Sequence, residues 1–123
     1  MSNPKGKINL PGNNASVPRH FQAGGTIADL PPGQHLFLVV EVEGLMWPKG
    51  EAQLQNMAWT CDVYEGGDPP GGRFALSLFA IGGQGFETVT AWLERGKATD
   101  SYPGMEHIPQ GIRLHSIRLR LAG

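Results

Sequence analysis

Carboxylates are the residues of this sequence best suited to acid–base chemistry. Glu41 and Glu43 are two residues apart in an apolar run, so on a strand they share one face. Asp62 and Glu65 lie close together further along the chain. Two carboxylates in one site can act as general acid and general base in a hydrolysis, but the same residues also fit a solvated sheet face or a protected sheet edge. Since no G-x-S-x-G motif surrounds Ser77, we expect no catalytic residues and a protein that is not an enzyme.

The sequence contains no pattern typical of a metal or cofactor site. The histidines, at positions 20, 35, 107 and 115, lack the short spacing of zinc ligands, and Cys61 has no second cysteine with which to form a disulfide. We interpret Cys61 as a small buried side chain. The glycine-rich stretches GGDPPGG and GGQG match neither a dinucleotide-binding motif nor a P-loop, so they are predicted to be turns. We therefore expect no metal and no cofactor, and single out His115 only because it interrupts the inward-facing pattern of its strand.

A basic ladder, Arg113, Arg118 and Arg120, lies near the end of the chain. A phosphate group or an acidic partner could bind it, or the arginines could pair with Glu41 and Glu43 on neighbouring strands. The sequence leaves both interpretations open. Ten Lys and Arg residues against eleven Asp and Glu residues give a net charge of -1, which does not favour non-specific binding of nucleic acid.

Two aromatic residues, Trp47 and Tyr102, each precede a proline inside a segment without periodicity. Loops on a rigid scaffold often carry recognition residues, and Trp and Tyr are effective interface anchors. The alternative is that these rings cap the open ends of the fold. The predicted binding residues are Trp47, Lys49, Glu51, Tyr102 and Met105.

The elements that must position these residues are mostly strands. The chain has 123 residues, of which 18 are Gly and 10 are Pro, and this length favours one domain, expected over 7–123 after a flexible tail at 1–6. Period-two patterns predict strands at 7–10, 20–28, 35–43, 57–65, 73–81 and 112–121. Between 86 and 96 the period changes to that of a helix, while 44–56 and 98–111 are predicted to be irregular connections. Trp59 and Trp92 fit the core-facing patterns of a strand and of this helix, respectively.

Strands separated by turns, with a single helix, favour an antiparallel β-sandwich that has one short helix before its last strand. A partly open barrel is the competing geometry. The longest apolar run, Leu36 to Val40, is far shorter than the roughly 20 residues that span a bilayer, and the first residues form no apolar leader. We therefore expect a soluble, cytoplasmic protein.

Parts of the sequence resemble small bacterial immunoglobulin-like or fibronectin-III-like modules. The resemblance lies in the strand INLP, the loop ending in Val17-Pro18, and the stretch FQAGGTIADLPPGQHLFLVVEV. It continues in WPKG (47–50), GGRFALSLFAI (71–81) and WLERGKATDSYPGM (92–105). This likeness implies an immunoglobulin-like sandwich and an interaction or accessory role, and some such modules accompany bacterial signalling or defence genes. The lack of a cysteine pair and the inserted helix differ from antibody-like domains.

The expected function is a non-enzymatic module that binds another protein, as an accessory subunit of a bacterial signalling or defence system. The alternative is a module that binds a small ligand or a carbohydrate, with the same aromatic rings stacking on a sugar. Neither a membrane nor nucleic acid is an expected partner, and a homo-oligomer is compatible with the sequence.

Overall fold

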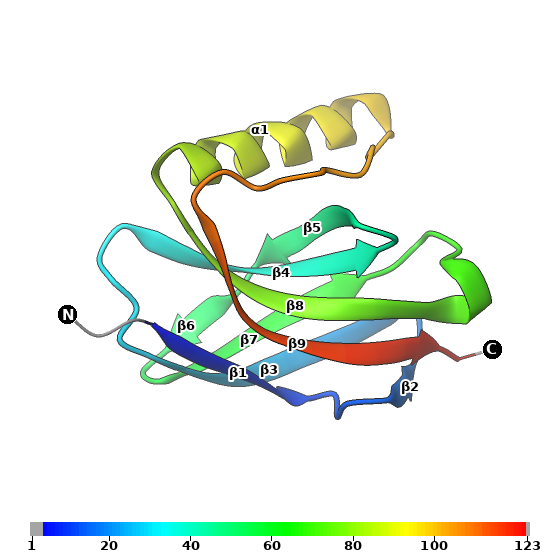
Figure 1. Ribbon diagram of the computed structural model, residues 1–123, viewed down its shortest axis with the longest axis horizontal. Helices are drawn as coiled ribbons and strands as arrows, with labels where there is room; N and C mark the ends of the chain where they lie inside the picture. The colour runs from blue at the N-terminus through cyan, green and yellow to red at the C-terminus, as the bar shows by residue number, and fades with distance from the viewer. Residues whose placement is uncertain (1–3, 123) are drawn as a thin grey trace.

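The strands of the computed structural model, which describes residues 4–122, form two sheets (Figure 1). The first sheet has the order β1-β3-β7-β6 and the second β2-β9-β8-β4-β5, and only the pair β2–β9 is parallel. The strands are β1 (Lys5–Leu10), β2 (Ala15–Val17), β3 (His20–Ala28), β4 (Gln34–Val42), β5 (Leu45–Glu51), β6 (Gln53–Gln55), β7 (Ala58–Tyr64), β8 (Arg73–Gly82) and β9 (Gly111–Leu121). The helix α1 (Gly83–Thr99) lies between β8 and β9, and Pro70–Gly72 form a single 3-10 turn. The predicted β-sandwich with one helix before the last strand is confirmed.

Several element boundaries differ from the prediction. Lys5 and Gly6, expected in a flexible tail, belong to β1, while residues 1–3 of that tail lie outside the described residues. The irregular connection expected at 44–56 is wrong, because it contains β5 and β6. β5 was not predicted because it contains a proline, Pro48, in its middle. Pro48 is tolerated because β5 is an edge strand, so its backbone needs no N–H donor toward a further strand at that position. The short strand β2 was also missed, and α1 extends beyond both ends of the predicted helix.

The main core lies between the two sheets and follows the predicted period of two. Trp59 is the largest fully buried side chain, and its indole N–H lies 3.2 Å from the backbone oxygens of both Lys7 and Thr26. The backbone of β1 approaches β3 so closely that a Cβ on Gly25 would lie 1.8 Å from the Lys7 oxygen. Glycine at position 25 is therefore required for this close approach.

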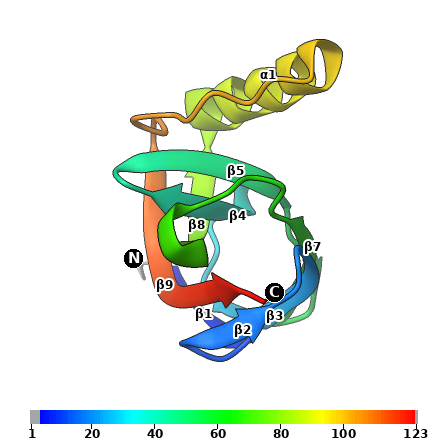
Figure 2. The same cartoon turned by 90° about the vertical axis from the view of Figure 1, so that its right-hand side faces the viewer.

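A second core lies on the outer face of the second sheet, where α1 covers β4 and β8. Figure 2 shows the helix as a separate layer above the sheets. The buried members of this core are Phe37, Val39, Phe79, Ile81, Val89 and Ile108, with Phe86 and Leu93 of the helix packed against them. Both faces of β4 are thus buried near its middle, which explains why its sequence is apolar without alternation. Within residues 4–122, no helix is long and apolar enough to cross a membrane.

Candidate binding cleft

An open cleft of about 770 Å³ lies between the C-terminal half of α1, strand β5 and the loop that follows β7. Aromatic and charged side chains from distant parts of the sequence line it. They include His20, Trp47, Lys49, Asp62, Tyr64, Glu65, Asp68, Trp92, Lys97, Asp100 and Tyr102. The residues Tyr64 and Tyr102 are 61% and 41% exposed, respectively, so both offer surface to a ligand.

One wall of the cleft is residues 100–105, here called the strap, which returns from α1 toward the second sheet. The indole N–H of Trp47 donates to the Tyr102 oxygen at 2.8 Å, and that of Trp92 donates to the Pro103 oxygen at 2.9 Å. Met105 forms a two-way backbone bridge with Met46 of β5, with both N···O distances at 2.8 Å. Two side chains and one backbone bridge therefore fix an otherwise irregular segment to α1 and β5.

Glycines allow the aromatic rings of this wall to pack against the backbone. The Tyr102 ring lies over Gly96, where an added Cβ would be 2.0 Å from a ring carbon. Trp92 and Tyr102 form an inclined pair, with ring centroids 5.3 Å apart and ring planes at 57°. On the strap itself, a Cβ on Gly104 would lie 2.7 Å from the ring of Trp47. The positions of the Tyr102 and Trp47 rings thus depend on glycine at positions 96 and 104, respectively.

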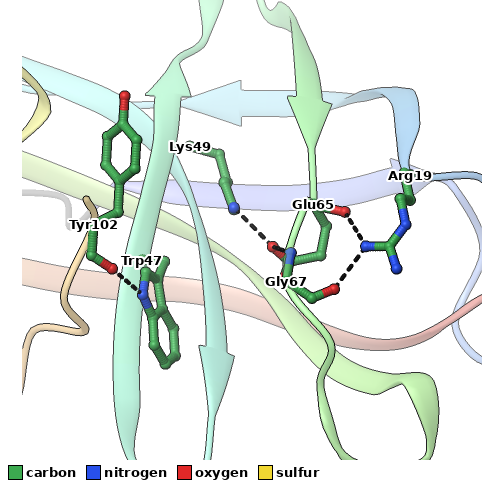
Figure 3. Close-up of polar contacts among 6 residues, drawn as sticks. All are labelled: Arg19, Trp47, Lys49, Glu65, Gly67 and Tyr102. Atoms are coloured by element: carbon green, nitrogen blue, oxygen red, sulfur yellow. Dashed lines mark hydrogen bonds and ion pairs between the residues drawn. The ribbon is translucent and has the colours of Figure 1, made fainter. Parts of the chain in front are cut away.

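The opposite wall is residues 65–70, here called the Glu65 loop. The buried carboxylate of Glu65 accepts from the Lys49 ammonium at 2.9 Å, and this ion pair lies on the floor of the cleft (Figure 3). Arg19 donates to the backbone oxygens of Glu65 at 3.1 Å and Gly67 at 2.6 Å, and to the Asp68 carboxylate at 2.9 Å. Four contacts from two cations, Lys49 and Arg19, therefore stabilise this glycine- and proline-rich loop.

The structure brings together three of the five predicted binding residues. Trp47, Lys49 and Tyr102 line the cleft, and Trp47 also packs against the main core, in keeping with the capping role considered for it. Glu51 lies elsewhere on β5, where it pairs with His35 at 2.7 Å. Met105 packs against the core beneath α1.

Sequence patterns misassigned or missed other residues of the cleft. Trp92 was predicted to be a core residue, but it is only half-buried and lines the cleft, because it lies at the edge of the helical stripe next to the strap. Trp59, by contrast, is confirmed as core. Arg19 carried no local signal, since its partners are 46 to 49 residues away.

A second hollow, of about 1000 Å³, lies on the part of the second sheet that α1 leaves uncovered. Near it, the predicted pairing of the basic ladder with a glutamate is confirmed once: the guanidinium of Arg113 binds the Glu41 carboxylate, with one N···O distance of 3.0 Å. This hydrogen bond raises the pKa of Arg113. Glu41 also accepts from the buried Ser77 hydroxyl. Arg118 and Arg120 line the hollow, and neither forms an ion pair with any residue of 4–122.

The remaining polar side chains singled out in the sequence have structural contacts. The Nδ1 atom of His115 accepts the backbone N–H of Ile8 at 2.8 Å, which ties β9 to β1 of the other sheet. Cys61 is buried as predicted, and burial, with a smaller contribution from Asp62, raises the pKa of its thiol to about 11. Among the described residues, no three His, Cys, Asp or Glu side chains are grouped so that they could hold a metal ion.

No protein-family model and no curated protein matches the chain. Its functional assignment therefore depends on what the cleft can do chemically. The floor charges of Lys49 and Glu65 neutralise each other, and both loops are fixed by contacts within the fold. Such a cleft is suited to recognition, because apolar rings are presented on rigid walls and little order has to be gained on binding.

Proposed function

We propose that this protein is a non-enzymatic interaction module that binds a segment of another protein in the cleft between the strap and the Glu65 loop. The observation that supports this most directly is the pair of exposed rings, Tyr64 and Tyr102, lining a cleft whose walls are fixed by hydrogen bonds and ion pairs. Preorganised aromatic side chains are typical anchors of protein interfaces. Prolines 48, 69 and 70 add rigid apolar surface to the same cleft.

An extended peptide segment suits this cleft better than a sugar ring does. The rings of Trp92 and Tyr102 are inclined at 57° to each other, so together they offer no single flat face on which a sugar could stack. The indole N–H groups of Trp47 and Trp92, which could donate to a sugar, already donate to the strap. A bound segment would instead place apolar side chains between the rings, as in other aromatic-lined peptide grooves.

The resemblance to bacterial immunoglobulin-like modules extends this proposal. It favours a cytoplasmic accessory subunit of a signalling or defence system, in which one protein recruits another. The two-sheet architecture is compatible with that relationship.

The test removes both exposed rings but keeps the backbone contacts that fix the strap. A Tyr64→Ala/Tyr102→Ala variant retains the Tyr102 backbone oxygen that Trp47 binds, and a melting curve checks that it is folded. The matched control, Leu54→Ala/Met57→Ala, removes two exposed apolar side chains that do not line the cleft. Partners captured by cross-linking in cells of the source organism are identified by mass spectrometry and then measured with purified proteins.

We expect the tyrosine variant to lose at least about 10-fold in affinity for the captured partner, and the control to lose none. Equal binding by both variants would contradict the proposal. A positive glycan array with no protein partner would favour the carbohydrate alternative instead.

A further inference from the structure

The part of the second sheet that α1 leaves uncovered carries three arginines, Arg73, Arg118 and Arg120, here called the arginine face. All three line the 1000 Å³ hollow, and none forms an ion pair with any residue of 4–122. Two glutamates also line the hollow, but one of them, Glu41, is already bound by Arg113 and Ser77. Positive charge is therefore in excess here, although the whole chain has a net charge of -1.

The strand register places like charges against each other. Arg73 of β8 is the direct cross-strand partner of Arg120 of β9, and Arg118 lies two residues before Arg120 on the same face. Like charges directly opposite each other in a sheet are destabilising. A pair of this kind, whose members form no ion pair within residues 4–122, is suited to an anion supplied by another molecule.

The arginine face continues directly from the cleft. Val42, at the end of β4, and Pro70, the last residue of the Glu65 loop, line both hollows, so they form the shared border of the two. A bound peptide that extends from the cleft across this border would lie next to the three arginines. The cleft and the arginine face therefore form one continuous surface.

We infer that the arginine face binds an acidic peptide segment, and, if the proposed function is correct, that this segment flanks the part of the same partner that occupies the cleft. Along β9, Arg118 and Arg120 repeat at two residues, or about 7 Å, which is also the repeat of same-side carboxylates on an extended peptide. Each guanidinium can donate two parallel hydrogen bonds to one carboxylate. A row at this spacing suits several separate carboxylates better than it suits one phosphate group.

The test uses probes that do not require the partner. Isotope-labelled protein is titrated with a hexaglutamate peptide, with inorganic phosphate and with a six-nucleotide single-stranded DNA, while the Nε–H signals of the arginines are followed by NMR. Arg73→Gln/Arg120→Gln is the test variant. The matched control is Lys7→Gln/Arg95→Gln, which removes two exposed positive charges that line neither hollow.

We expect hexaglutamate to shift the signals of Arg73, Arg118 and Arg120, and the test variant to bind it at least about 10-fold more weakly than the control. Binding should weaken with added salt. Equal binding by the two variants, or tighter binding of phosphate or of the oligonucleotide than of hexaglutamate, would overturn the assignment.

The same titration separates this inference from the proposed function. The Tyr64→Ala/Tyr102→Ala variant should bind hexaglutamate like the wild type even if it loses its protein partner. Loss of hexaglutamate binding in that variant would show that the peptide binds the cleft and would overturn the arginine face as its site.

Discussion

The ion pair on the cleft floor allows the sharpest test of what holds the Glu65 loop. Replacing Lys49 by Met keeps most of the side-chain volume but leaves the Glu65 carboxylate without its cation. The two side chains are 17% and 9% exposed, respectively, so Glu65 would become a largely buried, unpaired charge. Breaking a buried pair costs about 3–5 kcal/mol, and because this pair retains some contact with water we expect about 3 kcal/mol.

Urea denaturation, monitored by tryptophan fluorescence, measures this loss of stability. The Lys49→Met substitution should lower the urea concentration at the midpoint of unfolding by roughly 1–2 M. Removing both charges in a Lys49→Met/Glu65→Gln variant should recover about 2 kcal/mol, because no unpaired charge is left. Asp68→Asn serves as the control: it breaks the Arg19–Asp68 pair, whose side chains are 44% and 92% exposed, and should cost less than about 1 kcal/mol. The reasoning fails if Lys49→Met costs no more than Asp68→Asn, or if the double variant is no more stable than the single one.

Three further predictions concern single side chains. A Gly→Ala substitution stabilises an ordinary exposed helix by about 1 kcal/mol. In Gly96→Ala the added methyl group would meet the Tyr102 ring, so we expect a loss of about 1–3 kcal/mol in the same urea assay and weaker partner binding. A gain in stability would contradict the packing described. Because its pKa is about 11, the Cys61 thiol should stay unmodified by a thiol reagent at pH 8 in the folded protein and react only in denaturant, whereas rapid labelling of the native state would refute its burial. His115→Ala removes the acceptor of the Ile8 N–H and should cost about 1–3 kcal/mol, with faster amide exchange at Ile8; unchanged exchange there would show that the bond is unimportant.

The fold class followed from the sequence because its signals are local. The alternation of Trp59, Cys61 and Val63 depends only on the pleat of one strand, and all three side chains are buried as predicted. β5 was missed because a proline normally ends a central strand, and only the sheet order reveals that this strand lies at an edge. The helix was expected to stop at Gly96, but it continues to Thr99. Gly96 is not a C-cap; it leaves room for the Tyr102 ring, which packs against it.

The site was predictable only in part. Trp47 and Tyr102 were recognised as anchors because large aromatics without periodicity are unusual, and both do line the cleft. The partners that fix the cleft were not predictable, since Arg19 and Glu65 meet across 46 residues and no local pattern encodes such a pair. The sequence also did not predict which arginine of the basic ladder pairs with Glu41. That arginine is Arg113, and its position depends on a register shift between Leu78 and Phe79 in the pairing of β8 with β9.

The insertion between β8 and β9 accounts for both proposed surfaces. α1 covers the outer face of the second sheet over Phe37, Val39, Phe79 and Ile81, and the chain must then return to begin β9. That return is the strap, which becomes the aromatic wall of the cleft because Trp47 and Trp92 bind its carbonyl groups. Since the helix covers only part of this sheet face, the remaining part stays open and carries the arginines. One inserted element thus creates an apolar cleft and leaves a cationic surface beside it, and a partner that combines an apolar segment with adjacent acidic residues would be complementary to both.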